Sequence, residues 1–145
     1  MDYEKELNKM KKKNQKYLDE FKKWMQDKGL ADKTIKQHLS NADFYINDYL
    51  NYYDITEMSS GCYQIDSFLG DWFIRKCMWS TSYSIKTTAA SLKKFYLCMK
   101  ELGYIDKDDY DNLCCEIKEE MSNWCRRVDK YNDIDEDFDF SDLFL

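Results

Sequence analysis

Apolar residues recur every three or four positions through most of this chain, which is the spacing of one face of an α-helix. No proline interrupts the pattern, and each of the four glycines stands at or near a break in it. We therefore predict an all-α fold, a compact bundle of four to five helices. The pattern places these helices at about residues 14–28, 32–51, 65–78, 82–102 and 108–131.

Turn and capping residues support these boundaries. Gly29 and Gly103 follow the first and fourth apolar patterns, where a residue in the left-handed conformation commonly ends a helix. Asp32 is an acceptable N-cap for the second helix, and the hydroxyl residues at 80–82 can cap the fourth. Residues 52–64 are rich in turn-forming side chains and form the longest internal loop that we predict.

The length of 145 residues suits one domain. We divide the chain into an N-terminal extension of mixed charge (1–13), a helical domain (14–131) and an acidic, aromatic tail (132–145). No stretch approaches 18 uninterrupted apolar residues, so we expect no membrane span. The lysine-rich start lacks the apolar core of a secretory signal, and we expect a cytoplasmic protein.

The net charge of −6 hides a difference between the two parts of the sequence. Residues 1–100 hold 17 Lys/Arg and 13 Asp/Glu, whereas residues 101–145 hold 5 and 15. Such a split suggests a body that binds a polyanion or a partner beside an acidic tail. Disorder is the simplest interpretation of the tail at 132–145. The alternatives are docking on a protein partner and folding back onto the lysines of the body.

Residue types that support catalysis or metal binding are scarce. His38 is the only histidine, no CxxC pair occurs among six cysteines, and no phosphate-binding loop is present. We expect no metal, no cofactor and no catalytic site, and we expect the cysteines to be reduced. His38 is predicted at the edge of the core rather than in a ligand site, and the four tryptophans in or beside the core.

Several short motifs occur together in a familiar order. They are FKKWM at 21–25, KGLADKTI at 28–35, IDSFL at 65–69, a hydroxyl-rich turn at 80–84 and SLKKFY followed by MKELGYI within 91–105. Together they resemble the N-terminal core-binding domain, a SAM-like domain, of tyrosine recombinases and phage integrases. The resemblance covers about residues 14–105.

The resemblance implies a SAM-like helical fold and a role in holding DNA during recombination or integration of mobile elements. It does not extend to strand exchange. That reaction needs a catalytic domain with a tyrosine nucleophile and a cluster of cationic residues. Here there are three arginines, one histidine and no His-x-x-Arg, and the Asn-Pro pair that usually precedes the catalytic domain is missing.

In that family the second and fourth helices lie against duplex DNA. Lysines recur every seven residues on the predicted fourth helix and so share one face; with two neighbours they are Lys86, Thr87, Lys93, Lys94 and Lys100. A weaker polar face on the second helix holds Lys33, Thr34, Lys36 and Gln37. We predict that these nine residues contact phosphates with little sequence selectivity, because neither face has an arginine to read guanine.

Two alternatives remain open at this point. The lysine faces can be ordinary solvated surfaces, and the chain would then be a protein–protein interaction module of the same fold with no affinity for DNA. The N-terminal lysines Lys9, Lys11, Lys12 and Lys13 can form a basic arm, although a helical extension with solvated charges is the simpler interpretation. The oligomeric state is left open.

Overall fold

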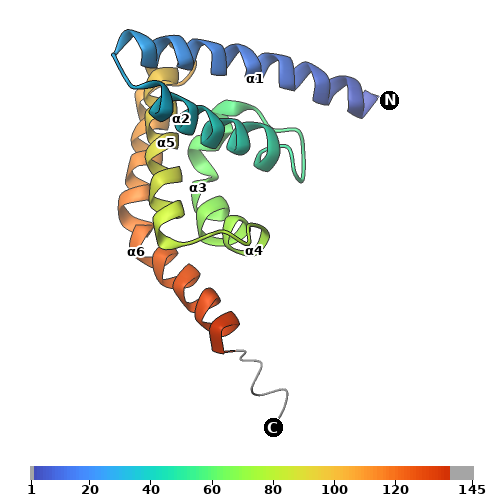
Figure 1. Cartoon of the computed structure of the whole chain (residues 1–145). Helices are drawn as coiled ribbons and strands as arrows, with labels where there is room; N and C mark the ends of the chain where they lie inside the picture. The colour runs from blue at the N-terminus through green and yellow to red at the C-terminus, as the bar shows by residue number, and fades with distance from the viewer. Residues whose placement is uncertain (1, 138–145) are drawn as a thin grey trace.

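The computed structural model describes residues 2–137, with side chains described through Asp133. Within these residues the fold contains helices and no strand, which confirms the predicted all-α class (Figure 1). Six α-helices are present: α1 (Asp2–Asp27), α2 (Asp32–Asp43), α3 (Ile65–Ser67), α4 (Phe73–Lys76), α5 (Ser82–Glu101) and α6 (Lys107–Asp137). None of them is long and apolar enough to cross a membrane.

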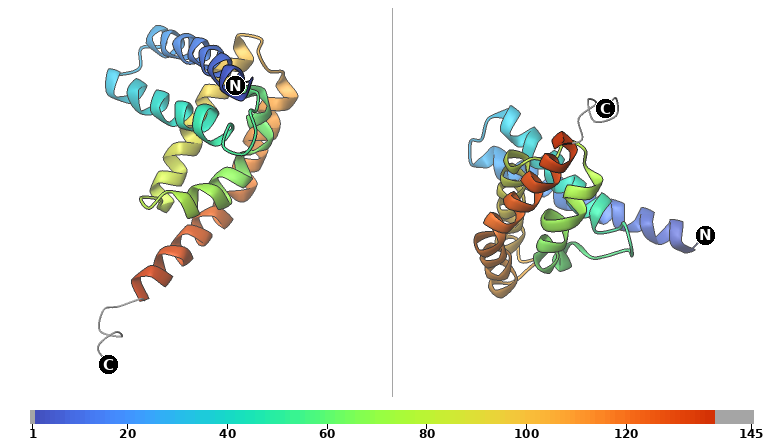
Figure 2. Two further views of the ribbon diagram at one scale, coloured as in Figure 1. Left: turned by 90° about the vertical axis from the view of Figure 1, so that its right-hand side faces the viewer. Right: turned by 90° about the horizontal axis from the view of Figure 1, so that it is seen from below.

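Helix α1 begins at Asp2 and runs unbroken to Asp27, so the helix predicted from residue 14 starts twelve residues earlier. Its buried stripe includes Tyr17, Phe21 and Met25, whereas nearly all residues before Met10 are exposed. Figures 1 and 2 show this first part of α1 reaching past the rest of the bundle. The N-terminal lysines therefore belong to a helical extension.

Helix α2 passes directly into a π-helical stretch, Phe44–Tyr49, within the helix predicted at 32–51. The predicted loop at 52–64 contains a 3-10 helix, Met58–Tyr63, that lies against the core. Two buried tyrosines hold it: Tyr45 donates to the Gly61 carbonyl and Tyr96 to the Met58 carbonyl, both at 2.7 Å. Burial raises the pKa of both phenols, which therefore stay protonated as donors.

The predicted helix at 65–78 is continuous from Ile65 to Lys76, but a π-helical stretch, Phe68–Trp72, separates α3 from α4. Gly70 lies in this stretch, where α6 approaches closely. A Cβ at Gly70 would lie 2.8 Å from the Trp124 ring and from Nη1 of Arg127. Trp124 also donates through Nε1 to Asp66 at 2.7 Å, so α6 is fixed against this region.

Helix α5 lies between α2 and α6 and carries much of the core (Figures 1 and 2). A capping box of Thr81 and Ser84 begins it, which agrees with the predicted hydroxyl cap. Helix α6 continues to Asp137, six residues beyond its predicted end. The first part of the expected tail is thus helical, and residues 138–145 lie outside the described residues.

The histidine and tryptophan predictions agree with the structure in most respects. All six cysteines are free, and burial raises the pKa of the Cys62 and Cys98 thiols to about 12. His38 is half-buried at the edge of the core. Trp72 and Trp124 are buried and Trp24 is partly buried, whereas Trp79 is 58% exposed.

Candidate nucleic-acid interface

Helices α2 and α5 are joined by a polar cluster centred on Ser91. The Ser91 hydroxyl donates to the Thr87 carbonyl at 3.1 Å and receives a hydrogen bond from Asn41 at 2.9 Å. The remaining neighbour is Nδ1 of His38, 2.7 Å from the same oxygen. Because the hydroxyl has one proton and gives it to Thr87, the imidazole donates through Nδ1. This cluster fixes how the two candidate DNA-binding helices lie against each other.

The surroundings of His38 favour the neutral form of its imidazole. Burial lowers the pKa of the imidazole, and the positive charge of Lys94 on α5 lowers it further. Lys94 therefore sits on the α2 side of α5, and it is half-buried. Thr87, whose hydroxyl bonds the Ser84 carbonyl at 3.1 Å, is also half-buried on this helix. These two residues border the α2–α5 contact rather than standing clear in solvent.

The outer side of α5 is basic and lacks acidic groups of its own. Between residues 72 and 100 the sequence has six Lys/Arg side chains and no carboxylate. Lys86 and Lys93 are exposed, seven residues apart on this helix. Their spacing corresponds to about 10 Å along the axis, since an α-helix rises about 1.5 Å per residue. A rigid helix with unpaired lysines at this separation can contact successive phosphates of a strand.

Lys100 faces a different neighbour. Its ammonium lies 4.7 Å from the centroid of the Tyr110 ring on α6, in a cation–π arrangement. The next residue, Glu101, accepts a hydrogen bond from the Trp24 indole on α1. The end of α5 is therefore occupied by contacts within the fold, and Lys100 is half-buried. Of the three lysines in the predicted stripe, Lys86 and Lys93 are exposed to solvent.

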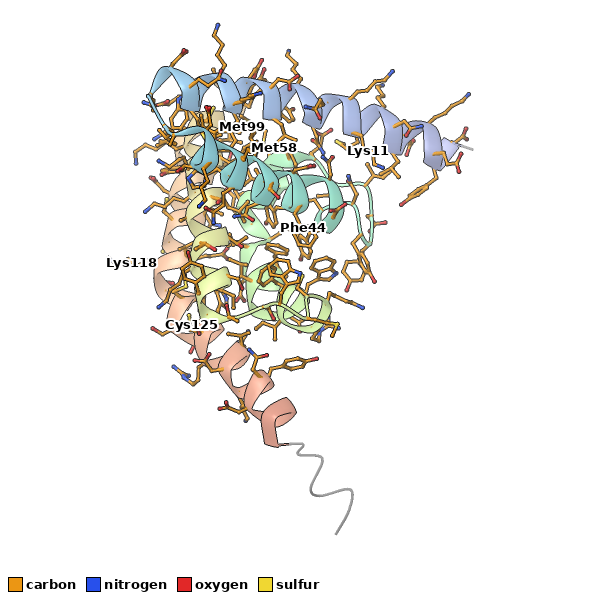
Figure 3. All side chains as sticks on the ribbon, in the orientation of Figure 1. Lys11, Phe44, Met58, Met99, Lys118 and Cys125 are labelled. Carbon is orange, nitrogen blue, oxygen red and sulfur yellow. The ribbon has the colours of Figure 1, made fainter. Side chains whose placement is uncertain are left out.

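A shallow hollow between α5 and α6 adds one lysine that the sequence pattern did not single out. Lys93 lines this hollow together with Lys118 and Asp111, and Cys114, Cys115 and Ile117 complete the lining. Figure 3 shows Lys118 at the outer edge of the paired helices α5 and α6. Helix α6 is acidic overall, which conceals this lysine in the sequence. Only the packing of α6 on α5 brings it beside Lys93.

The α2 residues are also divided between two sides. Lys33, Lys36 and Gln37 are exposed, and Thr34 is half-buried. Lys36 lies one turn before Leu39 and Ser40, which line a hollow shared with Lys22 of α1. Lys36 thus belongs to the α1 side of α2. Gln37 lies one turn before Asn41, which donates to Ser91, and so belongs to the α5 side of α2.

Compared with models of protein families, with curated proteins and with solved structures, the chain matches none of them. Among the side chains that the structure describes, through Asp133, no three of His, Cys, Asp or Glu gather as metal ligands. What the geometry offers is a pair of packed helices with an exposed, locally basic surface. Such a surface can neutralise an anion, and its lysines act as point charges rather than as readers of a base sequence.

Proposed function

We propose that this chain is a non-catalytic DNA-binding domain of the SAM-like core-binding type found in tyrosine recombinases. It contacts the backbone of duplex DNA through α2 and α5, in the context of recombination or integration of mobile elements. The observation that carries the proposal is the side-by-side packing of these helices around Ser91. This packing places a basic surface without carboxylates on α5 next to the exposed polar face of α2.

The contacts in this proposal are electrostatic. Lys33, Lys86 and Lys93 approach phosphates, Lys94 borders the seam, and Lys118 extends the surface onto α6. None of the three arginines lies on α2 or α5: Arg75 binds Asp71 at 2.8 Å, Arg127 donates to the Gly70 carbonyl at 3.1 Å, and Arg126 is exposed on α6. Without arginine in the interface we expect weak selectivity for sequence. The acidic residues after position 100 oppose DNA, so binding should be modest and sensitive to salt.

The second candidate is a protein–protein interaction module with no affinity for DNA. One observation favours it: the turn between α4 and α5 exposes Met78, Trp79 and Tyr83, which are unusual residues to leave in solvent together. Both candidate functions use the same fold, and neither proposal includes catalysis.

The deciding experiment is a fluorescence-anisotropy titration of labelled duplex DNA at about 50 mM and about 150 mM salt, where screening differs. The change is a triple reversal of Lys86, Lys93 and Lys94 to Glu in the full chain. We expect binding that weakens as salt rises, and a loss of at least about tenfold in affinity for the variant, because phosphate contacts dominate non-specific binding.

The matched control reverses Lys5, Lys9 and Lys12, three exposed lysines of α1, to Glu. It changes the net charge equally and leaves the α2–α5 surface intact. An equal loss of affinity in both variants would show a diffuse charge effect and would contradict the assigned interface. No binding by the original chain at the lower salt concentration would move the function to protein interaction.

A further inference from the structure

The α4–α5 turn and the first turn of α5 hold three exposed large side chains, two of which, Met78 and Tyr83, are the most exposed large hydrophobic residues among those that the structure describes. Met78 is fully exposed, Tyr83 is 75% exposed and Trp79 is 58% exposed. Folded chains seldom place three such residues within six positions of one turn unless something covers them. The turn adjoins α6, as the ribbon of Figure 2 shows.

This turn is held in place rather than loose. Ser82 donates to Asp129 of α6 at 2.9 Å, and Asn132 of α6 donates to the Ser80 carbonyl at 3.1 Å. Trp79 packs edge-on against Phe73, with ring centroids 5.0 Å apart. Beside Asn132 lies Tyr131, which is 42% exposed. We call the four exposed residues the end patch: Met78, Trp79, Tyr83 and Tyr131.

Two lysines lie next to residues of the end patch. Lys86 follows Tyr83 by about one helical turn, and Lys130 is adjacent to Tyr131; both are exposed. The ammonium of Lys76 lies over the Tyr52 ring instead, 5.6 Å from its centroid. Two carboxylates are also near: Asp129, which accepts the hydrogen bond from Ser82, and Asp133, one residue beyond Asn132. The end patch therefore combines exposed apolar side chains with a border of mixed charge.

The chain itself contains a segment of matching chemistry. Residues 138–145 read FDFSDLFL, which is five large apolar residues, two aspartates, one serine and no cation. The segment follows Asp137, six residues after Tyr131, so it begins about 9 Å along the α6 axis from this member of the end patch. Eight residues can span up to about 26 Å, which is enough to return.

We propose that residues 138–145 pack on the end patch of their own chain. Phe138, Phe140 and Phe144 lie against the methionine and aromatic side chains, and Asp139 and Asp142 lie near Lys86 and Lys130. A short tether favours this contact over one between two molecules, because it gives an effective concentration in the millimolar range. The proposal does not depend on DNA binding.

The test follows the methionine methyl groups of the full chain by NMR. In the tail variant, Phe138, Phe140 and Phe144 are changed to Ser, which removes the apolar contact and keeps both aspartates. We expect the Met78 methyl resonance, shifted by aromatic rings in the original chain, to move to the position of a free methionine. Met58 and Met99 are buried and should keep their resonances, which shows that the fold is intact.

A reciprocal variant, Met78→Glu with Tyr83→Glu, changes only exposed side chains of the end patch. It should lose any protection of the amides of residues 138–145 from hydrogen exchange. Tyr3→Ser, at an exposed tyrosine of α1, is the matched control and should leave both readouts unchanged.

Three results would overturn the proposal. The first is a Met78 resonance at the same position in the original chain and in the tail variant. The second is hydrogen exchange at the amides of residues 138–145 that is as fast in the original chain as in the reciprocal variant. Finally, a Met78 shift that grows with protein concentration, together with a dimeric mass in sedimentation, would assign the end patch to a second copy of the chain instead.

Discussion

The two sides of α5 differ in what they require of their neighbours. The inner side holds Ser91, Phe95 and Tyr96, each with a specific partner at close range. The outer side holds Lys86 and Lys93, which stand in solvent. The inner side depends on shape and hydrogen-bond geometry, and the outer side depends on charge. Substitutions on the two sides should therefore separate stability from binding.

The largest effect is expected where the inner side of α5 meets the 3-10 helix. Gly61→Ala would place a Cβ over the Tyr96 hydroxyl and 2.8 Å from the Tyr45 ring, so both buried tyrosines would have to move. We expect a loss of about 3 kcal/mol in the free energy of unfolding, measured by urea denaturation. Gly103→Ala is the control: its φ of 83° is unfavourable for alanine, but its surroundings are open. It should cost about 1 kcal/mol. Equal effects would show that the tyrosine contact tolerates repacking.

The Ser91 cluster should give a smaller loss. Ser91→Ala removes the oxygen that receives hydrogen bonds from His38 and Asn41. Both partners are half-buried, so water can replace part of each bond, and we expect a loss of about 1–2 kcal/mol in the free energy of unfolding. Ser40→Ala changes an exposed serine of α2 and should have an effect within about 0.5 kcal/mol. A neutral Ser91→Ala would mean that the cluster does not fix the two helices.

Substitutions on the outer side of α5 should leave the free energy of unfolding nearly unchanged. The triple reversal of Lys86, Lys93 and Lys94 to Glu should alter the free energy of unfolding by less than about 1 kcal/mol, because these side chains make no ion pair in the described structure. Chemical denaturation of the variant used for DNA titration checks this. A large loss of stability would show that the outer side also supports the fold. A loss of DNA binding in this variant could then result from unfolding.

The sequence predicts the inner side better than the outer side, for a physical reason. Apolar periodicity placed α2, α5 and most of α6 because burial favours one continuous stripe per helix. The π-helical stretch between α3 and α4 could not be read from this pattern, since it accompanies the close approach of Trp124 and Arg127 to Gly70. The early start of α1 was missed because its first residues are polar on nearly every face.

The candidate site was predicted only in part. Lys86 and Lys93 are exposed as the seven-residue spacing indicates. The same spacing includes Lys100, and nothing in it indicates that Tyr110 lies beneath that ammonium. Lys118 joins Lys93 from a helix 25 residues further along the chain. Contacts between distant segments decide which lysines are available, and periodicity within one helix carries no information about them.

The smallest expected effect is on the pH dependence of stability and involves His38, which contacts Ser91 and is influenced by Lys94. Burial and then Lys94 lower the pKa of this imidazole below its usual value of about 6.5. The unfolded chain therefore takes up a proton at higher pH than the folded chain does. The His38 contribution to stability is complete above about pH 6.5 and declines as the pH falls below that value. The His38→Gln variant should lose this part of the pH dependence of the free energy of unfolding.

His38 is the only histidine, so an NMR titration reports its pKa directly. We expect a value below 6.5 in the original chain. Lys94→Gln removes the neighbouring positive charge and should raise the pKa, but burial should keep it below the value of a free histidine. Lys86→Gln is the matched control, because Lys86 has no influence on this imidazole. A pKa at or above 6.5 in the original chain, or an equal shift in both variants, would contradict the contact between Lys94 and the α2–α5 seam.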